Sequence, residues 1–317
     1  MEFGFYLPTR GPTCQAEPLT ALVQQAEQFG FTSTMVGDHI VFPVTVNSPY
    51  PYTANGVFPG GGDALEQMSL IAFLAARTRT LRLVTSILIV PQRNPLLAAK
   101  TIATIDVLSG GRIGVGVGLG WMREEFEALG VDIFDRRGSV TDEYLRIFKL
   151  LWTQDPVSFS GRFYSFKDLH CMPHPVQKPH PPILVGGSSK AALRRAARFG
   201  DGWHPVGANP GVPLGPDELL ASRDELYRLA EAEGRDPQSI TISYKVPVSD
   251  PTLLAYYASR KERVPFSGSA AEIAGDVAKF AGMGVRELIF DFRSEVLAQS
   301  LERMERFGEV IRMTRAL

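Results

Sequence analysis

The chain alternates short apolar runs with longer segments in which apolar residues recur every three or four positions. This recurrence predicts amphipathic helices, and the clearest one carries Leu19, Leu22, Val23 and Ala26 on one face and ends before Gly30. The short runs predict eight strands, at 2–7, 34–37, 81–90, 112–119, 183–185, 202–204, 240–246 and 287–291. Helices are predicted at 19–29, 64–78, 96–108, 191–199, 217–232, 270–281 and 295–313, with a further helical region that ends near Trp152.

The regular alternation of strands and helices predicts the fold class. Each strand is followed by a helix, which calls for parallel strands joined by helical crossovers. Eight such units without a break in composition favour an α/β fold, a (β/α)8 TIM barrel, as a single domain over residues 1–317. An open, doubly wound sheet is the alternative.

Two insertions interrupt the alternation, one after the second strand and one before the fifth. Residues 40–62 are rich in Pro, Gly, Asn and Tyr, and residues 158–182 contain many prolines. The pieces 157–159 and 163–166 indicate a hairpin in the second insertion. Because the loops that follow barrel strands build the active site, residues 40–62 are predicted to form a wall of a pocket.

The composition speaks against nucleic-acid-binding, membrane and disulfide-rich proteins. The chain has 33 Lys+Arg against 34 Asp+Glu, so it lacks the basic excess that attracts nucleic acid or anionic membranes. The longest apolar run, 81–91, contains Arg82 and is shorter than the ~18 residues of a membrane span. Two cysteines make no disulfide framework, and no charged stretch precedes the N-terminal apolar run. A reducing, cytoplasmic location is therefore expected.

A glycine-rich run at 112–121 predicts an unusual strand. It lacks the G-x-G-x-x-G of dinucleotide-binding folds, because Leu119 stands where the third glycine is required. Glycines instead alternate at 114, 116, 118 and 120, so one face lets a planar ligand or another backbone come close. Ligand contact and tight packing within the barrel both stay open as explanations.

The segment 185–190 predicts an anion-binding site. Gly186 and Gly187 end a strand, and Ser188, Ser189 and Lys190 open a helix. Main-chain N–H groups, hydroxyls and a positive charge therefore gather at a helix N-terminus. A plain serine cap would need only one of these features. We favour a phosphate as the ligand.

Asp38 and His39 follow the second predicted strand, at the end where barrel enzymes carry out their chemistry. A carboxylate beside an imidazole can tune proton transfer near neutral pH. Adjacent residues on a strand point to opposite sides, so the two side chains need not act together. A structural Asp38 with a solvent-exposed His39 is the alternative.

Other polar residues are assigned to structure rather than to chemistry. Four potential metal ligands cluster at 170–180, but prolines force this chain to be extended and no carboxylate lies between 169 and 185. No metal site is predicted there. Asp106 and Arg112 are predicted to form a structural ion pair, and Asp201, between a helix and a strand, is predicted to be structural as well.

Several segments together resemble a known family. They are Gly37-Asp38-His39 and the runs 83–121, 161–166 (GRFYSF), 174–188 (HPVQKPHPPILVGGS) and 196–203 (AARFGDGW). In this order they resemble the bacterial-luciferase-like monooxygenase superfamily and, within it, the branch that uses the deazaflavin coenzyme F420. The resemblance covers nearly the whole chain and implies a TIM barrel that is usually a homodimer.

The resemblance also implies where a flavin-like ring lies, at the C-terminal mouth of the barrel. Members carry a non-proline cis peptide in the third strand that supports the ring. Thr85, Ser86 and Ile87 match that place, with the cis bond expected at Ser86–Ile87. The other implied cofactor contacts are Asp38, Gly118, Gly120 and Trp121 beside the ring, and Gly187 and Ser188 at the phosphate.

Departures from the family pattern bear on the substrate. Sugar-phosphate dehydrogenases of this branch have a Trp shortly after the Asp–His pair and a Glu after the glycine strand, where this chain has 42–44 (FPV) and Trp121. No Lys or Arg occurs between 199 and 222, where a substrate phosphate would be clamped. These departures speak against glucose-6-phosphate and favour a weakly polar substrate near the aromatic residues Phe42, Tyr50, Tyr52 and Phe58.

Three functions are compatible with the resemblance. The leading one is an oxidoreductase that moves a hydride between F420 and a small organic molecule, with His39 as proton donor or acceptor. The second is an FMN-dependent monooxygenase that uses reduced FMN and oxygen. The third is a non-catalytic flavin-binding relative.

Overall fold

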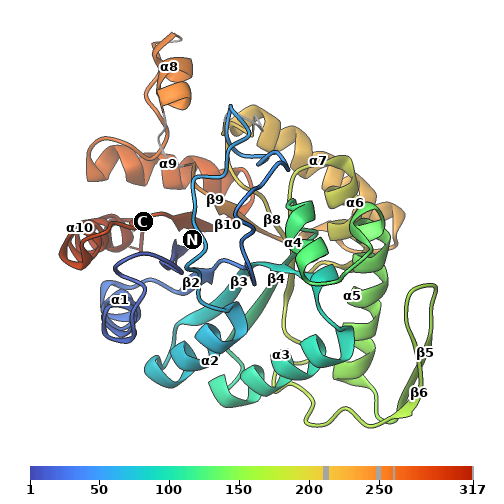
Figure 1. Ribbon diagram of the computed structural model, residues 1–317. Helices are drawn as coiled ribbons and strands as arrows, with labels where there is room; N and C mark the ends of the chain where they lie inside the picture. Colours follow the sequence, from blue (N-terminus) through green and yellow to red (C-terminus); the bar gives the residue numbers. More distant parts are fainter. Residues whose placement is uncertain (210–213, 248–250, 260, 316–317) are drawn as a thin grey trace.

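The computed structural model describes residues 1–209, 214–247, 251–259 and 261–315, and the predicted TIM barrel lies at its centre (Figure 1). Eight parallel strands close in the order β1-β10-β9-β8-β7-β4-β3-β2. Because β1 pairs with both β2 and β10, the alternative of an open sheet is wrong. The strands are β1 (Glu2–Tyr6), β2 (Ser33–Val36), β3 (Arg82–Ile89), β4 (Ile113–Gly118), β7 (Ile183–Gly186), β8 (Gly202–His204), β9 (Thr241–Lys245) and β10 (Val285–Phe290).

Helices surround the strands (Figure 1). They are α1 (Ala16–Phe29), α2 (Gln67–Arg77), α3 (Pro95–Ser109), α4 (Arg123–Ala128), α5 (Arg137–Thr153), α6 (Lys190–Phe199), α7 (Pro216–Ala232), α8 (Pro251–Ser259), α9 (Ala270–Gly282) and α10 (Leu297–Arg315). Their ends follow local chemistry. For example, the Asn94 side chain caps the N-terminus of α3, and Gly110, with φ 67°, ends that helix. Within the described ranges no helix is both long and apolar enough to cross a bilayer.

Two elements lie outside the barrel itself. The predicted hairpin is confirmed as β5 (Val157–Ser160) and β6 (Ser165–Leu169), which project beside α5 (Figure 1). The buried Glu143 carboxylate of α5 holds the tip of the hairpin by accepting hydrogen bonds from three consecutive main-chain N–H groups, those of residues 162–164. Helix α8, which the sequence pattern did not predict, lies at the top of Figure 1, away from the other helices.

The inside of the barrel is partly polar. A small apolar cluster there consists of Met35, Val84, Leu184 and Ile289. Buried polar side chains of the strands include Ser33, His204, Ser243 and Glu287, which hydrogen-bond with one another inside the barrel. Barrel interiors are mostly filled by branched apolar residues, and a buried polar group is costly unless it is hydrogen-bonded. The polar side chains therefore need partners, and they find them in one another, as described below.

The ion pair predicted between Asp106 and Arg112 is wrong, although both residues are structural. The Asp106 carboxylate accepts hydrogen bonds from the main-chain N and side-chain Nε2 of Gln177, at 3.0 and 2.6 Å. The Arg112 guanidinium donates to three main-chain carbonyl oxygens and to Thr78 Oγ1. Each side chain forms hydrogen bonds with a segment that is distant in sequence. The spacing of residues along the chain does not reveal such partners.

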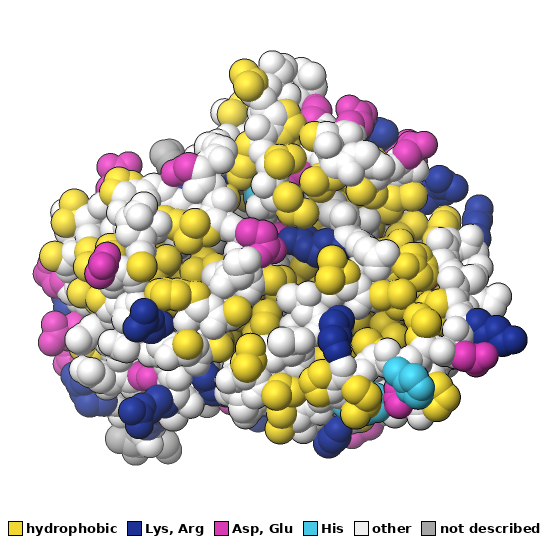
Figure 2. Space-filling view, turned by 60° about the horizontal axis from the view of Figure 1, so that its bottom comes forward, with side chains coloured by type: hydrophobic (Ala, Val, Ile, Leu, Met, Phe, Trp, Pro, Cys, Tyr) yellow, Lys and Arg dark blue, Asp and Glu magenta, His cyan; other side chains and the backbone are white. Residues whose placement is uncertain are grey.

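An exposed apolar surface lies on α3 and on the chain that precedes β7. Figure 2 turns this side of the molecule forward and shows apolar side chains spread across it. Its exposed members are Leu97, Val107 and Leu108 of α3, with Met172 and Val176 nearby. The homodimer implied by the resemblance stays a prediction.

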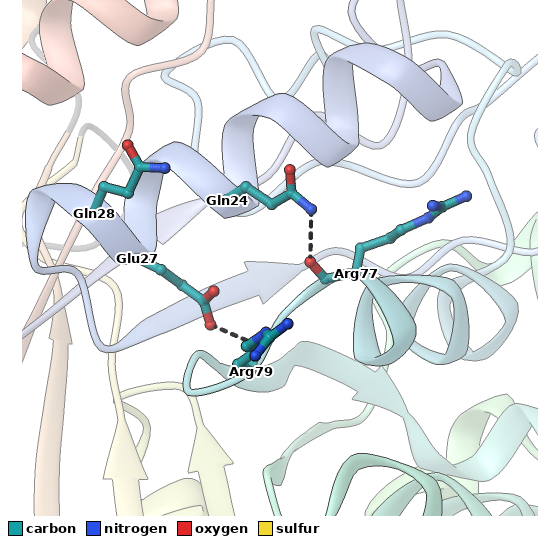
Figure 3. A pocket seen from close by; sticks show the side chains of 5 residues that line it. All are labelled: Gln24, Glu27, Gln28, Arg77 and Arg79. Carbon is teal, nitrogen blue, oxygen red and sulfur yellow. Dashed lines mark hydrogen bonds between the residues drawn. The ribbon is translucent and has the colours of Figure 1, made fainter.

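A cleft of about 360 Å³ lies between the C-terminal parts of α1 and α2 (Figure 3). Helices in this fold run opposite to the strands, so this cleft is at the N-terminal end of the barrel, away from the mouth. Glu27 Oε1 accepts hydrogen bonds from the main-chain N–H groups of residues 79–81. The Gln24 side chain donates to the Arg77 carbonyl oxygen. These contacts fasten α1 to the turn before β3, and this indicates a structural cleft.

Candidate active site

The C-terminal ends of the strands bring together polar side chains that are far apart in the sequence. Tyr6 ends β1, His39 follows β2, His204 ends β8 and Lys245 ends β9. The Lys245 Nζ lies 3.8 Å from the centroid of the Tyr6 ring. TIM-barrel enzymes carry their active sites at this end of the barrel, so it is the candidate site.

Strand β3 is irregular where the resemblance implies contact with a cofactor ring. Its pairing with β4 shifts register between Thr85 and Leu88. The peptide bond Ser86–Ile87 is cis, as expected from the resemblance. The Ser86 hydroxyl lies on the inside of the barrel, where it contacts His204 Nε2 at 2.9 Å. A contact between Thr85, Ser86 or Ile87 and a cofactor stays a prediction.

The alternating glycines of β4 leave room for this irregular segment. A Cβ at Gly116 would overlap the Thr85 carbonyl oxygen, and a Cβ at Gly118 would overlap the Ile87 side chain. The close approach of another chain segment, one of the two explanations left open, therefore accounts for both glycines. Gly120 has φ 78°, and a Cβ there would lie 2.8 Å from side-chain atoms of two neighbours. Cofactor contacts at Gly118 and Gly120 stay predictions.

Asp38 joins the end of β2 to the end of β3. Its carboxylate accepts two hydrogen bonds from the Arg93 guanidinium, both at 2.7 Å, and one from the Ile89 main-chain N–H at 2.8 Å. Burial lowers the pKa of Arg93, but attraction to Asp38 and then to Glu66 outweighs it, so the pKa lies above its ordinary value. Asp38 thus has a complete set of structural partners and does not pair with His39, while its predicted contact with the cofactor stays a prediction.

His39 pairs instead with Glu125, a buried residue of α4 that the sequence pattern did not single out. His39 Nδ1 lies 3.0 Å from Glu125 Oε2, and Glu125 Oε1 accepts the main-chain N–H of Ile40 at 2.8 Å. Burial raises the pKa of Glu125, but the hydrogen bond and charge of His39, together with hydrogen bonds from Gln92 and Ile40, lower it more, so the pKa lies below its ordinary value. The carboxylate fixes the proton on Nδ1 and leaves Nε2 for a ligand.

An aromatic wall surrounds His39. Its ring centroid lies 4.6 Å from that of Phe42, 5.5 Å from that of Phe58 and 6.3 Å from that of Trp121. Tyr50 packs against Trp121 at 5.1 Å. The insertion 40–62 therefore lies against the chain that follows β4, and its aromatic residues gather beside the candidate proton donor or acceptor.

The start of α6 has the features of the predicted anion site and also those of a serine cap. Ser189 Oγ accepts the main-chain N–H of Ala192 at 3.2 Å, which is an ordinary N-cap. Gly187 has φ 93°, and an added Cβ there would meet only Ala192, at 3.4 Å. The chain before α6 is therefore open beside Gly187. Phosphate binding by Gly186, Gly187, Ser188 and Ser189 stays a prediction.

Basic residues at the mouth were missed by the sequence reasoning. Lys245 and Arg293 flank the Tyr6 ring, and Arg293 forms an ion pair with Asp291. Burial lowers the pKa of Lys245 to about 8, although Asp291 opposes this. Within the described residues Lys245 has no carboxylate within 4.0 Å. Arg10 Nη1 is buried there without a hydrogen-bond partner. The polar residues at alternate positions of 241–245 were the sequence signal that could have pointed to Lys245.

The potential metal ligands at 170–180 do not converge. His170 contacts Asp155, His174 contacts the Gln154 carbonyl oxygen and His180 contacts the carbonyl oxygen of the next residue. In the described part of the chain, no group of three His, Cys, Asp or Glu side chains is placed to hold a metal ion.

His204 is expected to make the stability of the protein depend on pH. Burial lowers the pKa of His204 to about 4, although the charge of Glu287 opposes this. Unfolded histidine titrates near ~6.5, so between these values the unfolded chain binds more protons and stability falls as the pH is lowered, by up to about 3 kcal/mol. Urea denaturation between pH 7 and 4 measures this loss. His204→Gln should remove it, and an unchanged slope in that variant would assign the loss to other groups.

Comparison with known proteins identifies the family. The model of the luciferase-like monooxygenase family matches residues 1–250. The chain belongs to this family. An uncharacterised protein of Mycobacterium tuberculosis is 37% identical over 236 residues, 74% of each chain. An FMNH2-dependent dimethylsulfone monooxygenase of Pseudomonas putida is 40% identical over 166 residues, which cover 51% of this chain and 45% of that protein.

Solved structures share the fold of this family member over almost all of the chain. A monooxygenase from Streptomyces bottropensis has a TM-score of 0.75 and 24% identity, covering 99% of this chain and 100% of that one. An F420-dependent secondary alcohol dehydrogenase, solved with an F420–acetone adduct, has a TM-score of 0.75 and 19% identity, with 99% of each chain covered. At these identities the likeness bears on the fold alone. The proteins that this chain is similar to thus include one named for its dependence on F420 and one named for its dependence on FMNH2.

Proposed function

We propose that this luciferase-like protein is an F420-dependent oxidoreductase, which transfers a hydride between the deazaflavin and a small, weakly polar organic substrate. The proposal depends above all on the His39–Glu125 pair. A buried carboxylate orients an imidazole at the barrel mouth, at 3.0 Å, inside an aromatic wall. An oriented imidazole beside an apolar binding surface suits proton transfer to or from a weakly polar substrate.

The residues at the mouth fit an acidic coenzyme. Three basic side chains, Arg10, Lys245 and Arg293, lie near two carboxylates, Asp63 and Asp291. Within the described chain Arg10 Nη1 is buried without a hydrogen-bond partner, and Lys245 forms no ion pair at 4.0 Å or less. On the other side of the barrel the chain beside Gly187 is open. The ring would lie against 85–87 and Trp121, and the phosphate at 186–189.

When bound, F420 supplies a two-electron carrier that accepts or gives a hydride. The chain's own residues bind the coenzyme, orient the substrate and transfer protons. His39 Nε2 holds or gives a proton, and Glu125 keeps the imidazole in the tautomer that allows this. Phe42, Phe58 and Trp121 shape the substrate pocket and exclude water from it.

Cofactor titration tests the proposal. Purified protein is titrated with oxidised F420 and, separately, with FMN, and binding is followed by the fluorescence of each. Saturable binding of F420 at micromolar concentration, with weaker binding of FMN, is expected. Tight FMN binding without F420 binding would overturn the proposal. Coenzyme binding without turnover of any substrate tried would favour the non-catalytic alternative.

An FMN-dependent monooxygenase is the second candidate. It is favoured by the Pseudomonas putida relative, which is 40% identical over 166 residues and named for its dependence on FMNH2. This candidate predicts substrate-dependent uptake of oxygen in the presence of reduced FMN. The F420 proposal predicts no such uptake, so an oxygen electrode separates the two.

His39→Asn is expected to lower turnover about 100-fold, because a positioned acid or base typically contributes ~100-fold or more. Coenzyme binding should stay within about twofold, since the imidazole is replaced by a smaller amide rather than by a charge. The exposed His170, which lies on the hairpin side of the molecule, provides the matched control. Equal effects of His39→Asn and His170→Asn on kcat would contradict the assigned role.

A further inference from the structure

A row of hydrogen-bonded side chains crosses the inside of the barrel. The Tyr6 hydroxyl contacts Ser86 Oγ, and Ser86 Oγ lies 2.9 Å from His204 Nε2. His204 Nδ1 lies 3.2 Å from Ser243 Oγ, which donates to Glu287 Oε2 at 2.5 Å. Five strands, β1, β3, β8, β9 and β10, each contribute one residue. The row is continuous, and every member can donate or accept a proton.

The row connects the two ends of the barrel. Tyr6 ends β1 at the mouth, under the Lys245 ammonium group. Glu287 lies near the start of β10, where its Oε1 accepts hydrogen bonds from Ser33 Oγ at 2.5 Å and from Arg82 Nη2 at 3.0 Å. The Arg82 side chain is 43% exposed, so this end of the row lies close to solvent.

The carboxylate at one end sets the direction of every hydrogen bond. Ser243 gives its proton to Glu287, so it can only accept from His204 Nδ1–H. His204 Nε2 then carries no proton and accepts from the Ser86 hydroxyl, which in turn accepts from the Tyr6 hydroxyl. Burial lowers the pKa of His204 to about 4, which agrees with a neutral ring at pH 7. The Tyr6 oxygen therefore presents lone pairs to the mouth.

We propose that Tyr6, Ser86, His204, Ser243 and Glu287 form a proton relay, which takes a proton from a substrate hydroxyl at the mouth and delivers it to the Glu287 carboxylate. This inference rests on the proposed function and specifies its substrate class as an alcohol, or the corresponding carbonyl compound in the reverse direction. It gives the reaction a proton acceptor separate from His39, on β1, the strand that pairs with β2.

The proposed step balances. The substrate carbon loses a hydride, for which oxidised deazaflavin is the acceptor, and its hydroxyl oxygen loses a proton to the Tyr6 oxygen. The Tyr6 proton then moves to Ser86, and the Ser86 proton moves to His204 Nε2. On the other side of the ring, the proton of His204 Nδ1 moves to Ser243, and the Ser243 proton moves to Glu287. The four inner groups end with as many protons as they had, Glu287 ends protonated, and the alcohol becomes a carbonyl compound.

Charged groups face the row from the neighbouring elements. At the mouth they are Lys245 of β9 and Asp291 and Arg293 after β10. At the other end they are Arg82 of β3 and Glu2 of β1, which form an ion pair. Burial raises the pKa of Tyr6 to about 12, with Ser86 and Arg293 opposing. Tyr6 therefore passes a proton on within the row and is not a stable tyrosinate.

Breaking the row at Tyr6, next to the substrate, and at Ser243, far from it, tests the proposal. Oxidation of a panel of short primary and secondary alcohols by oxidised F420 is followed by loss of coenzyme fluorescence. Ser243→Ala and Tyr6→Phe should each lower kcat about 10-fold to 100-fold, within the range of general acid–base catalysis, with KM and F420 binding within twofold. The solvent deuterium effect on kcat should change in both. Ser243→Thr keeps the hydroxyl and should restore activity, and Ser300→Ala, a buried serine of α10, is the control.

A readout without turnover completes the test. The chain has five histidines, and ¹⁵N NMR of the free protein should show His204 neutral at pH 7 with its proton on Nδ1. Loss of this tautomer in Ser243→Ala is expected. A proton on Nε2, or unchanged kcat in Ser243→Ala, would overturn the relay. F420 binding without oxidation of any alcohol would overturn it too, and would leave the proposed cofactor standing. Absence of F420 binding would overturn the proposed function instead.

Discussion

Asp38→Asn is expected to lower the free energy of unfolding by about 4 kcal/mol, within the range for breaking a buried ion pair. The Asp38 side chain is fully buried, the Arg93 side chain is 13% exposed, and the two are joined by two hydrogen bonds of 2.7 Å. Asparagine removes the charge, and Glu66, at 3.5 Å, is then the one carboxylate that pairs with the guanidinium in the described part of the chain. Urea denaturation of the coenzyme-free protein measures the loss.

The exposed pair between Asp135 and Arg123 is the matched control for this substitution. Both side chains lie largely in solvent, so Asp135→Asn should change stability little. If Asp38→Asn were equally mild, the bond between the ends of β2 and β3 would not be structural. The role of Asp38 would then be contact with a ligand and not stabilisation of the fold.

Gly116→Ala is expected to destabilise the protein by at least about 3 kcal/mol, the upper end of the usual cost of overpacking. The added methyl group would overlap the Thr85 carbonyl oxygen, which is main chain in the irregular part of β3. A rotamer change cannot relieve this clash, so β3 and β4 would have to separate inside the barrel. Thermal and urea unfolding measure the effect.

Gly114→Ala, on the same face of the same strand, is the control for this prediction. Its methyl group would lie 3.1 Å from a side-chain carbon of Val84, which can shift slightly. A cost of about 1 kcal/mol is expected there. Similar losses of stability in both variants would contradict this prediction. They would show that β4 disfavours a side chain at either glycine, and not only at Gly116, where β3 comes closest.

The fold was largely readable from the sequence, because each strand and helix buries one face and repeats its pattern locally. All eight barrel strands and the hairpin before β7 are present near their predicted positions. The helical region after β4 is divided into α4 and α5 by a turn. Helix α8 was missed because it spans only nine residues and has no clear apolar face in the sequence.

The candidate site was readable only in part. His39 was predicted because it stands just after a strand, where barrel sites form, and Trp121 because of the family resemblance. The two rings do lie together in space. Glu125 was missed because it looks like one of several acidic residues at the start of a helix, and only the packing of α4 brings it to His39. Tyr6 and Lys245 were missed because their meeting depends on the neighbourhood of β1, β10 and β9 in the closed barrel.

The sequence by itself determined the TIM barrel and its two insertions, since these follow from local periodicity and from the order of elements. Only the tertiary structure decided the partners of the charged groups: Arg93 for Asp38, Glu125 for His39 and Ser243 for Glu287. Each pair joins residues from elements far apart in the chain. Closure of the barrel fixes which strands are neighbours, and burial then makes a hydrogen-bond partner obligatory for each of these groups.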